Sequence, residues 1–267
     1  MPEGDAVWRT AHRLHRALAG ADLTSSDLRW PSLATADLVG WRTVEVVPRG
    51  KHLLHRLVSP AGARWTLHSH LRMDGSWRVG PATAPAPRGH RLRAVLATES
   101  VRAAGWSLGM LDLVRTADEA RLVGHLGPDL LAADWDATVA ARRLLASGGP
   151  IGPALLDQRN CAGIGTMWAA ESLFGEGIHP LTPVDTLGQE RLVALLDRAR
   201  GLMRASIVGG RPGSERGAGG EEFAVFGRVR RPCHTCGTPV SKLDAGPVTQ
   251  ERGFSYCPSC QLATEIR

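Results

Sequence analysis

The spacing of apolar residues predicts a helix at the start of the chain. Over residues 2–19 apolar side chains recur every three or four positions, as at Val7, Ala11, Leu14 and Leu18. This period is typical of an amphipathic helix with one buried face. Pro2 suits its first turn, and Gly20 suits its end.

Residues 21–115 show a different pattern, in which short apolar runs alternate with polar positions. Turn-forming residues such as Pro, Gly and Asp separate the runs. The runs that read as strands are 44–47, 52–57, 65–68, 77–79 and 92–96. Several short strands at this spacing predict an antiparallel sandwich or barrel rather than alternating strand and helix units.

After residue 117 the helical period returns. We expect helices at 118–124, 136–147, 151–157, 167–175 and 187–206. A glycine-rich stretch over 209–220 has the composition of a mobile loop. The chain is therefore predicted to be an α+β protein of three domains: a β-sandwich with a leading helix at 1–117, a helical domain at 118–226, and a cysteine-bearing tail at 227–267.

Composition and charge exclude some classes of protein. Apolar residues make up 43% and charged residues 22% of the chain, which excludes a mostly disordered protein. No apolar run reaches the roughly 18 residues of a membrane helix, and acidic residues occupy the start, where a signal peptide is basic. We therefore expect a soluble cytoplasmic protein with no membrane partner. The net charge of +6 suits a polyanionic partner, or simply a basic protein.

Four of the five cysteines form two pairs near the C-terminus. Cys233 and Cys236 are followed, after 20 residues, by Cys257 and Cys260. Two such pairs can place four thiolates around one tetrahedral Zn²⁺, and a full set of four protein ligands makes the site structural. Iron–sulfur and redox sites are the alternatives. Arg252 is predicted at the tip of the hairpin between the pairs, where it could reach a phosphate or remain in solvent.

A glycine-rich turn joins two of the predicted helices. Gly163 and Gly165 precede Thr166, which we expect to cap the following helix. Backbone amides exposed at a helix N-terminus bind anions, so this turn is a candidate clamp for a DNA phosphate. An ordinary helix connection is the alternative.

The second residue is a candidate nucleophile. If Met1 is removed, Pro2 has a free secondary amine, and such an amine is partly neutral near pH 8 and attacks aldehyde-like carbon. Glu3 could transfer protons beside it. Taken alone, however, these residues favour an ordinary helix start over a nucleophile.

Together these motifs resemble one family, the formamidopyrimidine-DNA glycosylase/endonuclease VIII family of DNA repair enzymes, along essentially the whole chain. The matching stretches are MPEG at 1–4, RGKHLL at 49–54, HLRMDGS at 70–76, HLGPD at 125–129, the helix-two-turn-helix stretch at 156–174, VFGR at 225–228 and YCPSCQ at 256–261. Their order along the chain makes the resemblance specific.

The resemblance implies a bifunctional DNA glycosylase and abasic-site lyase. Pro2 would attack C1′ of the damaged nucleotide, displace its base and form a Schiff base that undergoes β- and then δ-elimination. Glu3 would transfer the protons, and Lys51 would contact a phosphate or the lesion. Arg252 would grip phosphates around the flipped nucleotide, and Met73 would fill the space left by its base, unless Met73 is a buried strand residue.

Three departures from the family pattern refine the reading. Thr166 stands where the family often has Asn, and Ala6 stands where many members have Glu. The stretch 105–115 lacks the Asp-Pro-Arg-Arg-Phe-Gly insertion of the formamidopyrimidine branch. The missing insertion, together with the stretch GSWRV at 75–79, favours the endonuclease VIII-like branch, of an actinobacterial type. Such a protein would act as a monomer at the nucleoid on oxidised pyrimidines and abasic sites in double-stranded DNA. The alternatives are an oxidised-purine glycosylase, a catalytically weak binder of damaged DNA, and a sequence-reading zinc-finger regulator.

Overall fold

The computed structural model describes residues 2–209 and 223–263, and its contacts divide the chain into two compact units. Unit 1 comprises Met1–Pro2 and Ala6–His125, and unit 2 comprises Glu3–Asp5 and Leu126–Arg267. Most of the predicted glycine-rich loop lies outside the described residues. No helix of the described part is long and apolar enough to cross a membrane.

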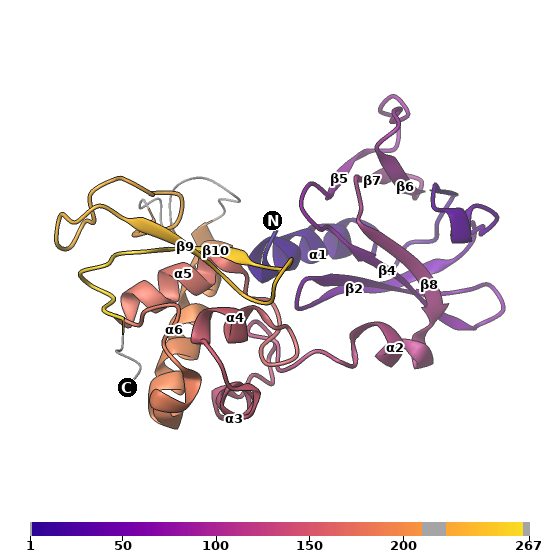
Figure 1. Cartoon of the computed structure of the whole chain (residues 1–267). Helices are drawn as coiled ribbons and strands as arrows, with labels where there is room; N and C mark the ends of the chain where they lie inside the picture. Colours follow the sequence, from indigo (N-terminus) through magenta and orange to yellow (C-terminus); the bar gives the residue numbers. More distant parts are fainter. Residues whose placement is uncertain (1, 210–222, 264–267) are drawn as a thin grey trace. The chain divides into compact units, whose positions relative to one another are not determined.

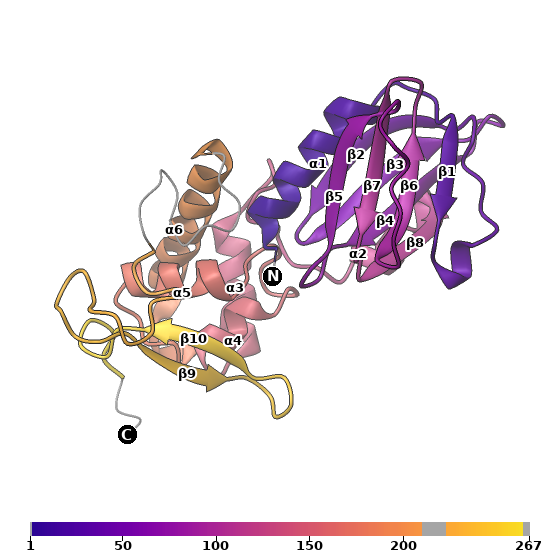
Figure 2. The ribbon, with the colours of Figure 1, turned by 90° about the horizontal axis from the view of Figure 1, so that it is seen from above.

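Unit 1 contains two antiparallel sheets of four strands each, with strand orders β1–β6–β7–β5 and β2–β3–β4–β8 (Figures 1 and 2). The strands are β1 (Ser25–Leu28), β2 (Arg42–Arg49), β3 (His52–Val58), β4 (Arg64–His70), β5 (Ser76–Pro81), β6 (Leu92–Ala97), β7 (Val101–Trp106) and β8 (Met110–Arg115). Short helical turns η1 (Pro31–Leu33), η2 (Thr116–Asp118) and α2 (Ala120–Val123) complete the unit.

Both sheets and the first helix share one apolar core. The helix α1 (Gly4–Leu18) buries the predicted apolar stripe, and Val7, Ala11 and Leu18 are fully buried. Leucines of β3, β4 and β8 pack in the same core as Trp77 of β5 and the alanines of β6 and β7. The predicted antiparallel sandwich with a leading helix is confirmed.

Three strands, β1, β7 and β8, are additional to the predicted runs. The residues of β7 include Ala103, Ala104 and Gly105, which have low strand propensity. A side chain at Gly105 would lie 2.7 Å from Leu108 and 3.2 Å from Trp77. Packing against these neighbours, rather than local propensity, selects the small residues of this strand.

Unit 2 contains four of the five predicted helices, with ends within three residues of those expected, whereas the helix predicted at 118–124 is α2 of unit 1. They are α3 (Ala137–Ser147), α4 (Ile151–Leu156), α5 (Thr166–Gly175) and α6 (Gly188–Gly209), with a short turn η3 (Val184–Thr186). The hairpin of β9 (Ser241–Ala245) and β10 (Arg252–Tyr256) lies beside α5 (Figure 2).

The cysteine-bearing tail shares its core with the helices. Phe254 of β10 is fully buried in the cluster that includes Leu155, Leu173 and Leu196. Gln261 adds polar contacts, because its side chain accepts from the Cys257 amide at 2.9 Å and donates to the Ile178 carbonyl at 2.7 Å. The helices and the tail therefore form one compact unit.

Candidate functional site

Glu3 occupies the N-terminus of helix α5. Its carboxylate accepts hydrogen bonds from the backbone amides of Gly165 at 2.8 Å, Met167 at 2.8 Å and Trp168 at 3.4 Å, and the side chain is only 3% exposed. Three amide donors and the positive end of the helix dipole suit an ionised carboxylate. The residue next to Pro2 is therefore fixed by backbone atoms.

Glycines make this close approach possible. A Cβ at Gly165 would lie 2.5 Å from the Glu3 carboxylate, and one at Gly4 would lie 2.9 Å from Met203. The Gly4 amide also donates to the Gly163 carbonyl at 2.8 Å. Two motifs that are 160 residues apart in the sequence thus meet within unit 2, and both need residues without side chains.

The glycine-rich turn differs from its predicted form. The N-cap residue is Gly165 without a side-chain hydrogen bond, and Thr166 is the first residue of α5, so the prediction that Thr166 caps the helix is wrong. The Gly163 amide donates to Oε1 of Gln158 at 3.0 Å, and the Gly165 amide donates to Glu3. Both glycine amides are therefore used inside the protein, and at Gly165 the Glu3 carboxylate supplies the negative charge expected from a phosphate.

Asp5 is a buried residue that sequence reasoning missed. Its carboxylate accepts from Nε1 of Trp168 at 3.1 Å and from Oγ of Ser206 at 2.7 Å, and it is 2% exposed. Residues 3–5 are therefore tied to both α5 and α6. An aspartate in the first turn of a helix indicates only a favourable dipole contact, so the sequence carried no signal for these two partners.

Lys51 lies in a two-residue turn between β2 and β3. Gly50 adopts a φ of 57°, which suits the first position of a tight hairpin turn, and Arg49 pairs with His52 on either side. The Lys51 side chain is only 8% exposed. Burial, followed by the charges of Arg72, His68 and Lys51, lowers the pKa of His70 to about 4.

Met73 lies in the turn that connects β4 and β5, and its side chain is 62% exposed. This excludes the alternative of a buried strand methionine. The preceding residue, Arg72, has a φ of 54° in the left-handed region, and a Cβ at Gly109 would overlap its side chain. The turn thus presents an apolar side chain to solvent from a constrained backbone.

Arg252 is the first residue of β10 and pairs with Ala245 across the hairpin. The loop at the hairpin tip spans residues 246–251, so Arg252 follows the tip rather than forming it. Its side chain is exposed.

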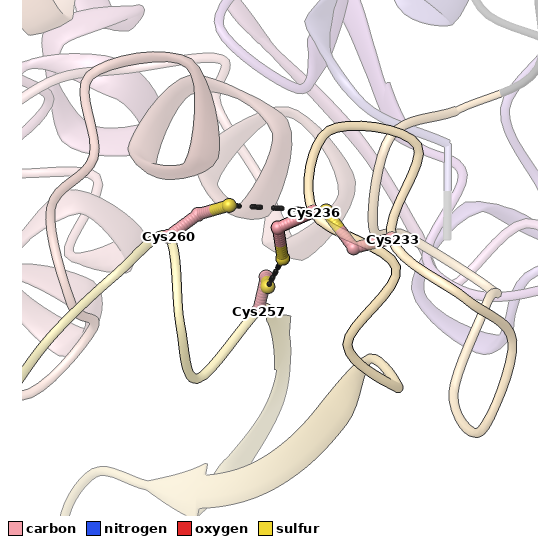
Figure 3. A group of neighbouring side chains, drawn as sticks. All are labelled: Cys233, Cys236, Cys257 and Cys260. Atoms are coloured by element: carbon pink, nitrogen blue, oxygen red, sulfur yellow. Dashed lines mark hydrogen bonds between the residues drawn. The ribbon is translucent and has the colours of Figure 1, made fainter.

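The four cysteines gather as the spacing predicts (Figure 3). All four Sγ atoms lie within 4.8 Å of one another, with Cys233 to Cys260 at 3.9 Å and Cys236 to Cys257 at 3.4 Å. Tetrahedral Zn²⁺ with Zn–S bonds of about 2.3 Å needs S–S separations of about 3.8 Å. The cluster therefore fits a four-coordinate metal ion with no open position.

Histidines of β3 and β4 form a connected group with Asp112 of β8 in unit 1. Nδ1 of His52 lies 2.8 Å from Nε2 of His68, and Nδ1 of His68 lies 2.9 Å from Oδ2 of Asp112. In the part of the chain that the structure describes, only the cysteines form a metal-ligand cluster. The alternation of His52, His68 and His70 along strands was the available signal, but it does not reveal their pairing.

Comparison with known proteins agrees with this arrangement. The model of the formamidopyrimidine-DNA glycosylase N-terminal domain matches residues 1–117, and that of the formamidopyrimidine-DNA glycosylase H2TH domain matches residues 126–216. A probable endonuclease 8 2 of Streptomyces coelicolor is 47% identical, over 100% of this chain and 96% of the relative. A DNA-(apurinic or apyrimidinic site) lyase of Mycolicibacterium smegmatis is 41% identical, over 99% of this chain and 100% of that protein.

The fold agrees as well. A crystal structure of Lactococcus lactis formamidopyrimidine-DNA glycosylase bound to DNA with an abasic site superposes with a TM-score of 0.83 and 25% identity. The alignment covers 98% of this chain and 100% of that chain. The chain belongs to the formamidopyrimidine-DNA glycosylase family.

Proposed function

We propose that this protein is a DNA glycosylase and abasic-site lyase of base excision repair that acts as a monomer on double-stranded DNA with damaged bases or abasic sites. The observation that carries the proposal is the anchoring of Glu3, because three backbone amides hold a carboxylate directly beside Pro2. Relatives over the full chain length are named as an endonuclease 8 and as an abasic-site lyase, which supports the same conclusion.

In the proposed reaction, the nitrogen of Pro2 bonds to C1′ as the glycosidic bond breaks and its electron pair leaves with the base. The ionised Glu3 takes the proton that this nitrogen loses and passes it to the ring oxygen, which opens the sugar to an iminium. β-Elimination and then δ-elimination release the phosphates on both sides. Chemistry at C1′ requires the nucleotide outside the helical stack, at a cost of a few kcal/mol.

The DNA contacts that we propose combine charge and shape. Lys51 contacts a phosphate or the lesion, and Arg252 contacts phosphates around the flipped nucleotide. Met73, exposed on its turn, fills the space left by the base, as unbranched apolar wedges do. The turn that holds Glu3 is formed by Gly163, Gly165 and Thr166. Within it, Thr166 is the candidate contact for a DNA phosphate.

The metal that we propose is one structural Zn²⁺, held by Cys233, Cys236, Cys257 and Cys260. When bound, it cross-links the two knuckles at the base of the β9–β10 hairpin. We assign residues 227–267 to this zinc finger, residues 118–226 to the helical DNA-binding region and residues 1–117 to the catalytic sandwich.

Oxidised pyrimidines are the proposed substrates, because the turn between β7 and β8 is short and lacks the insertion of the formamidopyrimidine branch. The test is base release and strand cleavage on a panel of duplexes that each carry one oxidised pyrimidine, one oxidised purine or one abasic site. We expect pyrimidine and abasic-site duplexes to be cut fastest. Faster release of an oxidised purine would assign the chain to the other branch.

The second candidate is a protein that binds damaged DNA without cutting it, and the departures from the family pattern at Ala6 and Thr166 favour it. Variants at Pro2 and Glu3 distinguish the two candidates. We expect Pro2→Gly and Glu3→Gln to lose base release while they still bind abasic DNA. Activity retained in both variants, or DNA binding without any cleavage by the wild type, would contradict the proposed enzyme.

A further inference from the structure

The histidine group lies on the face of one sheet of unit 1 that is turned away from the apolar core. The strand register places His52 opposite His70 and His68 opposite Asp112. The alternate positions of these strands, including Leu53, Leu67 and Leu111, fill the core on the other face. Three strands therefore contribute titratable side chains to one face of this sheet, and none of these side chains takes part in the proposed reaction.

Two hydrogen bonds join these side chains into a chain across three strands. Asp112 accepts from Nδ1 of His68, whose ring is completely buried, and Nε2 of His68 lies 2.8 Å from Nδ1 of His52. An ionised carboxylate can only accept, and a neutral histidine has one donor and one acceptor nitrogen. The network therefore assigns the proton of His68 to Nδ1 and that of His52 to Nδ1, which leaves Nε2 of His52 as an acceptor.

The surroundings keep His52 neutral. Burial, together with the charges of His68, His70, His125 and Arg49, lowers the pKa of His52 to about 3. The ring also contacts the rings of His70 and His125, at centroid distances of 4.8 and 6.4 Å. A neutral His52 therefore adds no positive charge that would repel the neighbouring Lys51 ammonium.

His52 is the first paired residue after the turn that carries Lys51. The pairing of His52 with Arg49 of β2 closes that turn, so this end of β3 is the base of the Lys51 turn. The hydrogen-bonded side chains of His52 on β3, His68 on β4 and Asp112 on β8 restrain that end of β3 in addition to the backbone hydrogen bonds between the strands. They are thereby placed to fix the direction in which Lys51 projects.

We propose that Asp112, His68 and His52 are positioning residues that hold the turn of Lys51 in its DNA-binding conformation. The proposal rests on the proposed function, in which Lys51 contacts a phosphate or the lesion. It adds three residues that act through Lys51 and do not themselves touch the substrate.

A double-mutant cycle tests this directly. Single-turnover cleavage of an abasic-site duplex is measured for wild type, His68→Phe, Lys51→Ala and the double variant. We expect His68→Phe to slow cleavage about tenfold in the wild-type background and less than about twofold in the Lys51→Ala background, since coupled residues show non-additive effects. Equal losses in both backgrounds would overturn the proposal, because a purely structural role does not depend on Lys51.

A milder pair of variants covers the case in which His68→Phe does not fold. In His52→Asn the side-chain amide donor lies near the position of the histidine Nδ1. In His52→Gln the longer side chain brings the donor closer to the position of the histidine Nε2. We expect His52→Asn to stay within about threefold of wild type and His52→Gln to lose about tenfold, with the second loss again absent in Lys51→Ala. Equal activities of the two variants would contradict the assigned hydrogen-bond chain.

His55→Asn is the matched control. His55 lies on the same strand, is buried, and bonds to Thr43 at 2.9 Å, but it belongs to the core face. His55→Asn should lower the melting temperature. Any effect that it has on cleavage should be the same in the wild-type and the Lys51→Ala backgrounds. If the proposed function is wrong, the wild-type protein will not cleave the duplex at all. If the wild type is active but the losses from His68→Phe and Lys51→Ala are additive, only the positioning role is refuted.

Discussion

Glu3 of unit 2 and Lys51 of unit 1, two of the charged residues in the proposed function, are held in different ways. Glu3 is fixed by the backbone amides of α5 in unit 2, with glycines clearing the space around it. Lys51 is carried on a tight turn in unit 1, beside a hydrogen-bonded chain of side chains. Backbone anchoring requires small residues at a few positions, whereas side-chain anchoring requires particular polar residues on several strands.

The largest effect should come from filling the space beside Glu3. Gly165→Ala places a Cβ 2.5 Å from the carboxylate, so Glu3 must move. Displacement of a catalytic group by about 1 Å costs on the order of a hundredfold in rate, and we expect that loss in strand cleavage at abasic sites.

The control for this change is Gly201→Ala in α6, where no atom lies within 4 Å of the added Cβ. It should leave cleavage unchanged and slightly stabilise the helix. Full activity of Gly165→Ala would show that Glu3 does not need its position on α5.

Metal removal should perturb unit 2 and leave the Lys51 turn intact. We expect metal analysis to find one zinc per chain in the wild type. Cys257→Ser should lose this zinc and bind abasic DNA with about a tenfold weaker affinity. Cys161→Ala, which changes the buried cysteine outside the cluster, should keep its zinc and its affinity. A zinc-free wild type with full DNA affinity would contradict the structural role of the metal.

A smaller effect is expected from the second carboxylate of the N-terminal segment. Asp5→Asn keeps the shape of the side chain but removes the charge that strengthens the bonds from Trp168 and Ser206. We expect about a threefold slower cleavage and a melting temperature lower by a few degrees. The exposed Asp197→Asn on α6 should change neither quantity, and an Asp5→Asn protein that behaves like it would remove Asp5 from the anchoring.

The smallest effect concerns stability against pH. Burial lowers the pKa of His52 to about 3 and that of His55 to about 4, below the unfolded value near 6.5. The unfolded chain therefore takes up protons first, so the stability from these neutral rings is complete above pH 6.5 and declines as the pH falls toward 4.

Urea unfolding at pH 7.5 and pH 5 measures this decline. His52→Asn and His55→Asn should each reduce the difference in unfolding free energy between the two pH values. An unchanged difference in both variants would show that these rings are protonated in the folded state.

The sequence revealed the backbone-anchored part of the site more completely than the side-chain-anchored part. The MPEG start, the turn of Gly163 and Gly165 and the cysteine pairs are local patterns whose chemistry follows from residue type and spacing. The family, the sandwich with its leading helix and the helical region were therefore predicted and are confirmed.

What escaped prediction depends on contacts between distant residues. Asp5 meets Ser206 across 201 positions, and His68 meets Asp112 across 44. Thr166 was assigned as a cap because its residue type suits one, but Glu3 took that role from outside the helix. Such pairings are set by strand register and helix packing, which periodicity alone does not specify.

The central claim is that Pro2, held beside the anchored Glu3, is the nucleophile. Borohydride reduction of the protein mixed with an oligonucleotide carrying one abasic site, followed by peptide mass mapping, tests it most directly. We expect a covalent adduct on Pro2 in a chain that lacks Met1. Absence of an adduct on a Met1-free chain that binds the DNA, or an adduct on a lysine instead, would contradict the account.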